Sequence, residues 1–195
     1  SGSWVDFTSA NVSAALLGAS ATDSEVQRDQ IICYIRGSNA TGCNPEKNIS
    51  DQVWKLGDVF RSTPITVGTP SAFYIDARDA NNQFSNHRNN HERTSANGLR
   101  LIVAGANDGQ MHAFNTGNGS EAWSFIPPNL LTKLKNMTHS THPTSLTHQY
   151  FLDGPVTVAD AWLGTGTGLA KAANTWKTIM VFGLGRGATN YSWSS

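Results

Sequence analysis

The chain has 195 residues, of which 38% are hydrophobic and 18 are glycine, and its 14 basic residues are balanced by 14 acidic ones. This composition is typical of a turn-rich β protein, and the scattered basic residues exclude the basic stripe of a nucleic-acid-binding protein. No apolar run approaches the roughly 20 residues that cross a bilayer, and the N-terminus lacks a signal-peptide pattern, so we expect any export signal to lie outside this chain.

Two helices are predicted near the N-terminus. Residues 8–17 predict a short helix that ends at Gly18. A second helix is expected over residues 23–36, because Thr22 and Glu25 have the spacing of a capping box. Its second half is apolar nearly all round, which predicts that this end is buried.

Cys33 and Cys43 are the only cysteines. In an exported protein such a pair predicts one short-loop disulfide, which would stabilise the fold by about 3 kcal/mol in the chain-entropy account. Two buried, unpaired thiols are the alternative. Without a C-x-x-C pair, the sequence excludes c-type haem attachment and a four-cysteine zinc site.

The next part of the chain predicts two strands, Thr63–Val67 and Ala72–Ile75, followed by a polar stretch over residues 77–97. This stretch has almost no apolar residue and many turn-forming residues. It therefore predicts a local insertion that forms either a long exposed loop or an ordered ion-binding loop.

Oxygen-bearing side chains gather at the start of this insertion. Asp76, Asp79 and Asn81 are candidate calcium ligands, with Gln83 as a further candidate, because calcium prefers six to eight oxygen atoms. The spacing does not match a helix-loop-helix calcium site. A solvated polar loop is the alternative interpretation.

Histidines are a second candidate group. His87 and His91 are four residues apart and would face one metal ion if the segment were helical. His139, His142 and His148 could add ligands. The segment gives no helix signal, however, and loop histidines are usually solvated.

Residues 99–127 predict three strands separated by two turns. An apolar run forms the first strand, the turn Asn107-Asp108-Gly109 leads to the second, and the turn 116–119 leads to the third, which ends at Phe125. Asp-Gly and Asn-Gly pairs supply the positive φ angles of tight hairpin loops. The pattern predicts one repeat of a β-propeller blade. Trp123, placed after an Asn-x-Gly turn, resembles the tryptophan-docking repeat of quinoprotein-dehydrogenase-like propellers.

The remaining elements are a short helix over residues 130–137 and two strands, 156–163 and 176–182. The glycine-rich runs 164–168 and 183–187 lack the strand-to-helix context of a phosphate-binding loop. They are therefore interpreted as turns. No Gly-x-Ser-x-Gly elbow is present, and no catalytic residue is predicted.

Five stretches in order resemble the PilC/PilY family: 54–68, 104–115, 124–134, 150–162 and 176–187. Members of this family are type IV pilus biogenesis factors and tip-associated adhesins, and their C-terminal domain is a β-propeller in which calcium is known. The resemblance implies a mainly β fold, a partial β-propeller of antiparallel blades with short helical excursions. It implies a non-enzymatic protein that is exported to the cell surface, outer membrane or pilus tip.

The resemblance also implies an organisation and partners. Residues 1–53 would form a helical lead-in, and 54–195 the first blades of an incomplete propeller, since six to eight strands cannot close one. The insertion 77–97 and the loop 138–148 would be contact surfaces for pilins, minor pilins or a host or surface receptor, while the remaining propeller covers the sheet edges. A fragment of a pyrroloquinoline-quinone-type dehydrogenase and a structural component of a surface filament are the alternatives.

Overall fold

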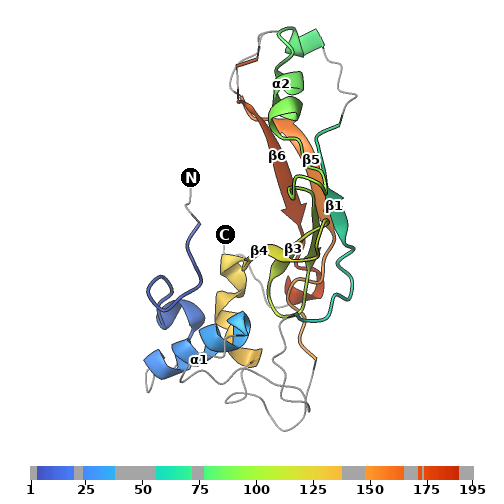
Figure 1. Cartoon of the computed structure of the whole chain (residues 1–195). Helices are drawn as coiled ribbons and strands as arrows, with labels where there is room; N and C mark the ends of the chain where they lie inside the picture. The colour runs from blue at the N-terminus through green and yellow to red at the C-terminus, as the bar shows by residue number, and fades with distance from the viewer. Residues whose placement is uncertain are drawn as a thin grey trace.

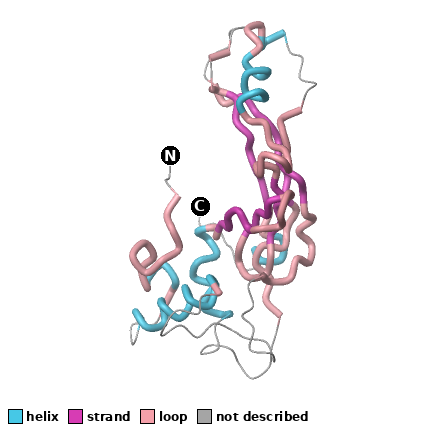
Figure 2. The backbone as a smooth tube through the Cα atoms, in the orientation of Figure 1, coloured by secondary structure: helices cyan, strands magenta, loops and turns pink. Residues whose placement is uncertain are grey.

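The computed structural model describes residues 4–19, 24–37, 56–71, 77–137, 148–164, 171–172 and 174–188. Helices η1, α1 and η3 gather at one end of the molecule, and α2 lies at the opposite end beyond strands β5 and β6 (Figures 1 and 2). In chain order the elements are η1 (Ala15–Leu17), α1 (Ser24–Arg36), β1 (Ile65–Val67), η2 (Ala77–Asp79), α2 (Gln83–Asn90), β2 (Leu101–Gly105), β3 (Met111–Asn115), β4 (Glu121–Phe125), η3 (Pro128–Met137), β5 (Val156–Trp162), β6 (Trp176–Phe182) and η4 (Gly185–Ala188).

Strands β1 to β4 form one antiparallel sheet in which each strand pairs with its neighbour in sequence. Val103 of β2 lies opposite Ile65 on one side and Ala113 on the other, and Ala113 in turn lies opposite Trp123. A four-stranded antiparallel meander is the unit from which propellers are built. The predicted mainly β fold is confirmed, and the sheet has the topology of one propeller blade.

Strands β5 and β6 form a second antiparallel sheet, with Val156 opposite Phe182 and Trp162 opposite Trp176. We refer to this pair of strands as the β5–β6 ribbon. The predictions of strands at 156–163 and 176–182 are confirmed, as is the strand predicted at 63–67, of which the structure assigns Ile65–Val67. The predicted strand 72–75 lies outside the described residues.

Gly109 sets the turn between β2 and β3 and brings it close to η3. Its φ is +88°, and a Cβ at this position would lie 2.6 Å from the Leu134 side chain. Glycine alone tolerates both the left-handed backbone and this approach. The helix predicted over 130–137 is therefore present as a 3₁₀ helix, Pro128–Met137, that packs against the hairpin.

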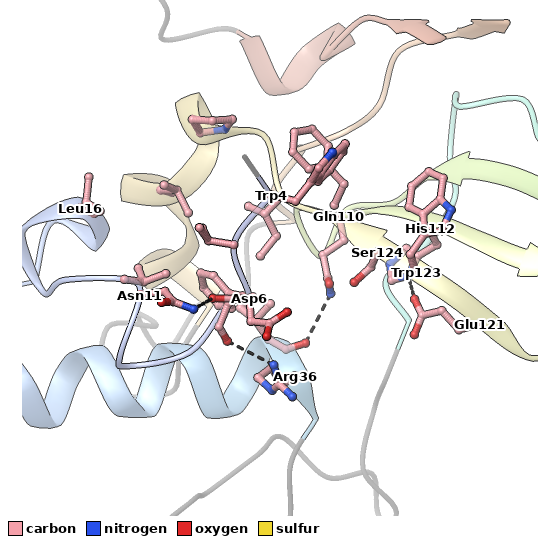
Figure 3. Close-up of a pocket in the computed structure, with 18 residues that line it drawn as sticks. Trp4, Asp6, Asn11, Leu16, Arg36, Gln110, His112, Glu121, Trp123 and Ser124 are labelled. Carbon is pink, nitrogen blue, oxygen red and sulfur yellow. Dashed lines mark hydrogen bonds and ion pairs between the residues drawn. The ribbon is translucent and has the colours of Figure 1, made fainter. Parts of the chain in front are cut away.

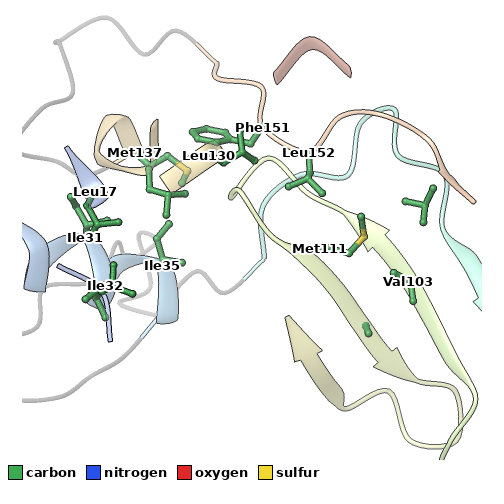
Figure 4. Close-up of a cluster of buried hydrophobic side chains, with 14 residues drawn as sticks. Leu17, Ile31, Ile32, Ile35, Val103, Met111, Leu130, Met137, Phe151 and Leu152 are labelled. Atoms are coloured by element: carbon green, nitrogen blue, oxygen red, sulfur yellow. The ribbon is translucent and has the colours of Figure 1, made fainter. Parts of the chain in front are cut away.

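The hydrophobic core runs from the helices into the sheet (Figure 4). Leu17, Ile31 and Leu134 come from the helical end, and each is fully buried. Val103 of β2 and Phe151, which precedes β5, are equally buried. The core thus joins the helices to the sheet, while the predicted domain boundary at residue 53 lies outside the described residues.

The two N-terminal helix predictions have different outcomes. The helix predicted over 23–36 is confirmed as α1, with its apolar second half buried. The helix predicted over 8–17 is wrong in extent, because only Ala15–Leu17 is helical. The backbone carbonyl of Thr8 accepts the N–H groups of Asn11 and Val12. The Asn11 side chain donates to the Asp6 carbonyl, so a side-chain hydrogen bond helps to hold a turn here.

The prediction of a long exposed loop over residues 77–97 is wrong. The segment contains η2 and α2, and Phe84 of α2 is only 6% exposed. The two carboxylate oxygens of Asp79 accept the backbone N–H groups of Gln83 and Phe84, which satisfies donors that a helix leaves free in its first turn. The buried Phe84 and the buried carboxylate of Asp79 thus contribute to the order of a polar sequence.

Across the described ranges, no helix combines the length and apolar character that a bilayer span requires.

The contact between Gly154 and Gly183 gives a test of this packing. A Cβ on Gly154 would lie 2.4 Å from the Gly183 carbonyl oxygen, whereas a Cβ on Gly183 meets nothing closer than 3.9 Å. We expect Gly154→Ala to lower the free energy of unfolding by about 1–3 kcal/mol, the usual cost of overpacking. Gly183→Ala is the matched control and should cost less than about 1 kcal/mol. Equal losses for the two variants in urea unfolding would contradict the close approach.

Candidate functional site

The α2 segment, defined as residues 77–97, lies at the end of the β5–β6 ribbon (Figure 1). Phe84 meets the ring of Trp176 edge-on at 4.8 Å. Asn81 bonds the backbone of Lys171 with both its amide nitrogen and its amide oxygen. The Lys171 ammonium group in turn lies 3.5 Å from the centre of the Trp162 ring. The segment is thus attached to both strands of the ribbon.

A polar network holds the inner face of α2. His87, 6% exposed, places Nε2 3.0 Å from Oδ1 of Asp160 on β5. Thr178 on β6 donates to the same oxygen at 2.7 Å, and Arg93 donates to the Thr178 hydroxyl at 2.9 Å. Arg93 also donates to the carbonyl of Gly68 just after β1. The network therefore connects the last turn of α2 and the residues that follow it to β5, to β6 and to the backbone just after β1.

The outer face of α2 is free for contact. Ser85 and Asn89 are exposed on this face, and the exposed Asn86 and Asn90 lie beside it at the rim of a cavity. Neutral amides and hydroxyls both donate and accept hydrogen bonds, so this face offers adaptable polar contacts without a net charge.

A small cavity of about 280 Å³ opens between α2 and β6. Its walls are rich in amide and imidazole groups. It is lined by Gln83, Asn86, His87, Asn90, His91, Asn174, Trp176 and Lys177.

The candidate calcium ligands have other roles where they are described. Asp79 is buried and uses both carboxylate oxygens on backbone N–H groups of α2. Asn81 bonds Lys171, and the amide of Gln83 donates to the Asn81 carbonyl at 3.4 Å. Asp76 lies outside the described residues. The calcium site therefore stays a prediction.

The cysteine and histidine predictions are only partly within the described residues. Cys33 is buried in α1, but Cys43 lies outside the described residues, so their disulfide stays a prediction. His139 and His142, with most of the predicted contact loop 138–148, also lie outside them. His148 is described, and its Nε2 lies 2.9 Å from Oδ1 of Asp58.

His148 lowers the pKa of the Asp58 carboxyl. Burial alone would raise the pKa of the Asp58 carboxyl, but hydrogen bonds from His148 and Asn107 lower the pKa below its usual value. His148 therefore stabilises an ionised carboxylate. It does not join His87 and His91, whose contacts are with each other and with the ribbon.

A larger cavity, about 880 Å³, lies beside β4, and we call it the β4 groove (Figure 3). Its other walls come from residues 4–16, the end of α1 and the start of η3. Trp4 packs edge-on against Phe125 at 4.9 Å, and Trp123 is 37% exposed. β4 is the outer strand of the described sheet, since it pairs only with β3.

A charge cluster centred on the buried His112 lies at the wall of the β4 groove. His112 is 2% exposed and lies between Asp108, whose Oδ2 is 2.9 Å from Nε2, and Glu121, whose Oε1 is 2.6 Å from Nδ1. Burial would lower the pKa of His112, but the hydrogen bonds and charges of the two carboxylates raise its pKa overall. Asp108 also accepts the backbone N–H of Gly57.

This cluster is suited to structure rather than to nucleophilic catalysis. Ser124 lies opposite His112 in the β3–β4 register. A serine nucleophile needs a histidine nitrogen that can accept its proton, and carboxylates already occupy both nitrogens of His112. Sequence reasoning missed this cluster, although His112 interrupts an apolar strand four residues after Asp108.

The described residues also hold no group of three or more His, Cys, Asp or Glu side chains arranged to bind a metal ion. A pyrroloquinoline-quinone-type dehydrogenase, the enzymatic alternative, would need calcium-ligating carboxylates at its propeller centre. No observation in the described part of the chain favours that alternative.

Comparison with known proteins places these features among relatives. The chain is 31% identical over 183 residues, 93% of its length, to a protein of Xylella fastidiosa (strain Temecula1) named type IV pilus biogenesis factor PilY1 homolog. It is 30% identical over 156 residues, 80% of its length, to type IV pilus biogenesis factor PilY1 of Pseudomonas aeruginosa (strain PAK). It spans only 13% and 12% of these two relatives. No family model and no solved structure matches the chain.

The raised pKa of His112 predicts a pH dependence of stability. Because the folded pKa lies above the unfolded value of about 6.5, the charged histidine stabilises the fold fully below pH 6.5, and this contribution is lost as the pH rises through the folded pKa. Replacing His112 by Gln should cost about 2 kcal/mol at pH 6 and less at pH 9. Urea unfolding of both proteins at the two pH values measures this difference. A difference that stays constant or grows toward pH 9 would contradict it.

Proposed function

This chain belongs to the PilY1 family of type IV pilus biogenesis factors, and we propose that it serves pilus biogenesis as a non-enzymatic, exported protein that makes contacts through its α2 segment. The contacts would be with pilins or minor pilins during assembly and with a host or surface receptor during attachment. The remainder of its own propeller would be a further partner. The relatives' names support the pilus system, and the geometry of α2 supports the contact surface.

One observation carries this proposal: α2 packs on the β5–β6 ribbon with one face, and its opposite face is exposed to solvent. Phe84 and His87 face the ribbon and are buried, whereas Ser85 and Asn89 face solvent. Binding by a preorganised surface avoids the entropy of ordering a loop at each encounter. A rigid polar face at the far end of a β scaffold is suited to recognition, and loops carried on rigid β scaffolds commonly have that role.

The calcium site at Asp76, Asp79 and Asn81 and the second contact surface at 138–148 belong to the same proposal. Calcium would act by stiffening the start of the α2 segment. Neither is needed for the contact face on α2 itself, because the described hydrogen bonds of Asp79 and Asn81 already hold that helix.

Two exposed α2 positions provide the test. We expect Ser85→Arg with Asn89→Arg to reduce attachment at least about tenfold, because two bulky charges would disrupt a neutral hydrogen-bonding face. The substitutions are made in the full-length protein of a strain that lacks its own copy, and attachment and surface pili are both counted. Point substitutions are preferred to deletion, which would uncover Trp176 and leave Asp160 without His87.

The matched control places the same charges elsewhere. Ser9→Arg with Ala15→Arg alters two exposed positions at the helical end of the molecule. The control strain should keep both attachment and surface pili. Unchanged attachment in the α2 variant would overturn the contact role of α2. Loss of surface pili together with attachment would assign α2 to assembly instead of adhesion.

A further inference from the structure

We propose that His87 and His91 bind one divalent transition-metal ion, Cu²⁺ or Zn²⁺, at the cavity between α2 and β6, and that Asp160 positions the His87 ring. Nothing in the proposed contact role of α2 requires this site. It rests on the placement of the two rings, on the hydrogen bonds that orient them, and on the cavity that both of them line.

The helix brings the two rings together. His87 lies in the last turn of α2, and His91 is the residue that caps its C-terminus. Residues four apart share one face of a helix. The ring centres are 4.4 Å apart with an angle of 40° between their planes. The last turn of α2 and its cap residue therefore place the two rings side by side, close enough to share one metal ion.

Each ring is also oriented by a hydrogen bond at one nitrogen. Nδ1 of His91 lies 2.8 Å from the backbone carbonyl oxygen of His87. A carbonyl oxygen can only accept, so this nitrogen carries the proton and Nε2 of His91 keeps its lone pair.

His87 is oriented in the same way by Asp160. Nε2 of His87 donates to the carboxylate oxygen at 3.0 Å, which leaves Nδ1 with the lone pair. A carboxylate that accepts the second N–H of a ligating histidine is the usual outer partner at metal sites. Thr178 holds that carboxylate in place with a hydrogen bond to the same oxygen. Both imidazoles therefore have one nitrogen engaged and one free to ligate.

The ligand atoms select the class of metal. Imidazole nitrogen suits Zn²⁺, Cu²⁺ and Ni²⁺, and the order of affinities places Cu²⁺ highest, whereas calcium prefers oxygen. Two imidazoles leave coordination positions open for water. The cavity of about 280 Å³ has room for such waters, and amide groups of Asn86 and Asn90 line it. Among the candidate calcium ligands, Asp79 and Asn81 lie at the opposite end of α2 from the two imidazoles.

Copper titration of the 195-residue chain tests the proposal. Cu²⁺ is added while electron paramagnetic resonance reports the number of coordinated nitrogens and calorimetry reports the affinity. We expect two imidazole nitrogens in the unmodified chain. His91→Ala should leave one nitrogen and weaken the affinity at least about tenfold, and Asp160→Asn should weaken it about 10- to 100-fold, as outer partners typically do.

A matched control separates copper binding at the α2 site from binding at another histidine, and a second measurement covers a variant that does not fold. His148→Ala removes an exposed histidine that, like the buried His87, contacts a carboxylate, and it should change neither the nitrogen count nor the affinity of the α2 site. Should a variant fail to fold, nuclear magnetic resonance of the unmodified chain replaces it: Zn²⁺ should shift the imidazole signals of His87 and His91 first. Full-strength copper binding in folded His91→Ala, or zinc shifts confined to other histidines, would overturn the proposal.

Discussion

The docking of α2 on the β5–β6 ribbon is the interaction on which the functional account depends. The α2 segment is almost entirely polar and cannot order itself by burying its own side chains. Phe84 against Trp176 supplies the apolar contact, and a fully buried phenylalanine contributes roughly 2–3 kcal/mol. The hydrogen bond from His87 to Asp160 fixes the rotation of the helix about that contact. Together they turn a polar insertion into a surface with a defined inner and outer face.

The rest of the fold gives this surface its position. The core that joins α1 and η3 to β2 and β3 anchors one end of the molecule, and the ribbon carries α2 to the other (Figures 1 and 4). Arg93 connects the β1–β4 sheet to the β5–β6 ribbon. It donates hydrogen bonds to the Gly68 carbonyl after β1 and to the Thr178 hydroxyl on β6. These hydrogen bonds attach the α2 segment to both sheets.

Local sequence signals predicted the strands but not the docking of the α2 segment on the β5–β6 ribbon. The Asn-Asp-Gly turn and the alternating residues around it predicted β2 to β4, because hairpin chemistry is decided by neighbours in sequence. Residues 77–97 gave no such signal, since their order depends on Trp176 and on Asp160, which lies 73 residues after its partner His87. The partners Asp160 and Thr178 face each other across the ribbon, and only a polar pair in the middle of two apolar strands hinted at them. The helix prediction for residues 8–14 was wrong for the opposite reason. There a local hydrogen bond from the Asn11 side chain to the backbone favours a turn over a helix.

Hydrogen exchange over the α2 segment shows whether this helix is docked on the ribbon or free. Backbone amides of residues 86–90 are expected to exchange roughly a hundredfold more slowly than those of the turn at 95–98, since opening α2 must first break the contacts of Phe84 and His87. Equal and rapid exchange across both stretches would contradict the account, because a free helix of this composition would have no fixed contact face.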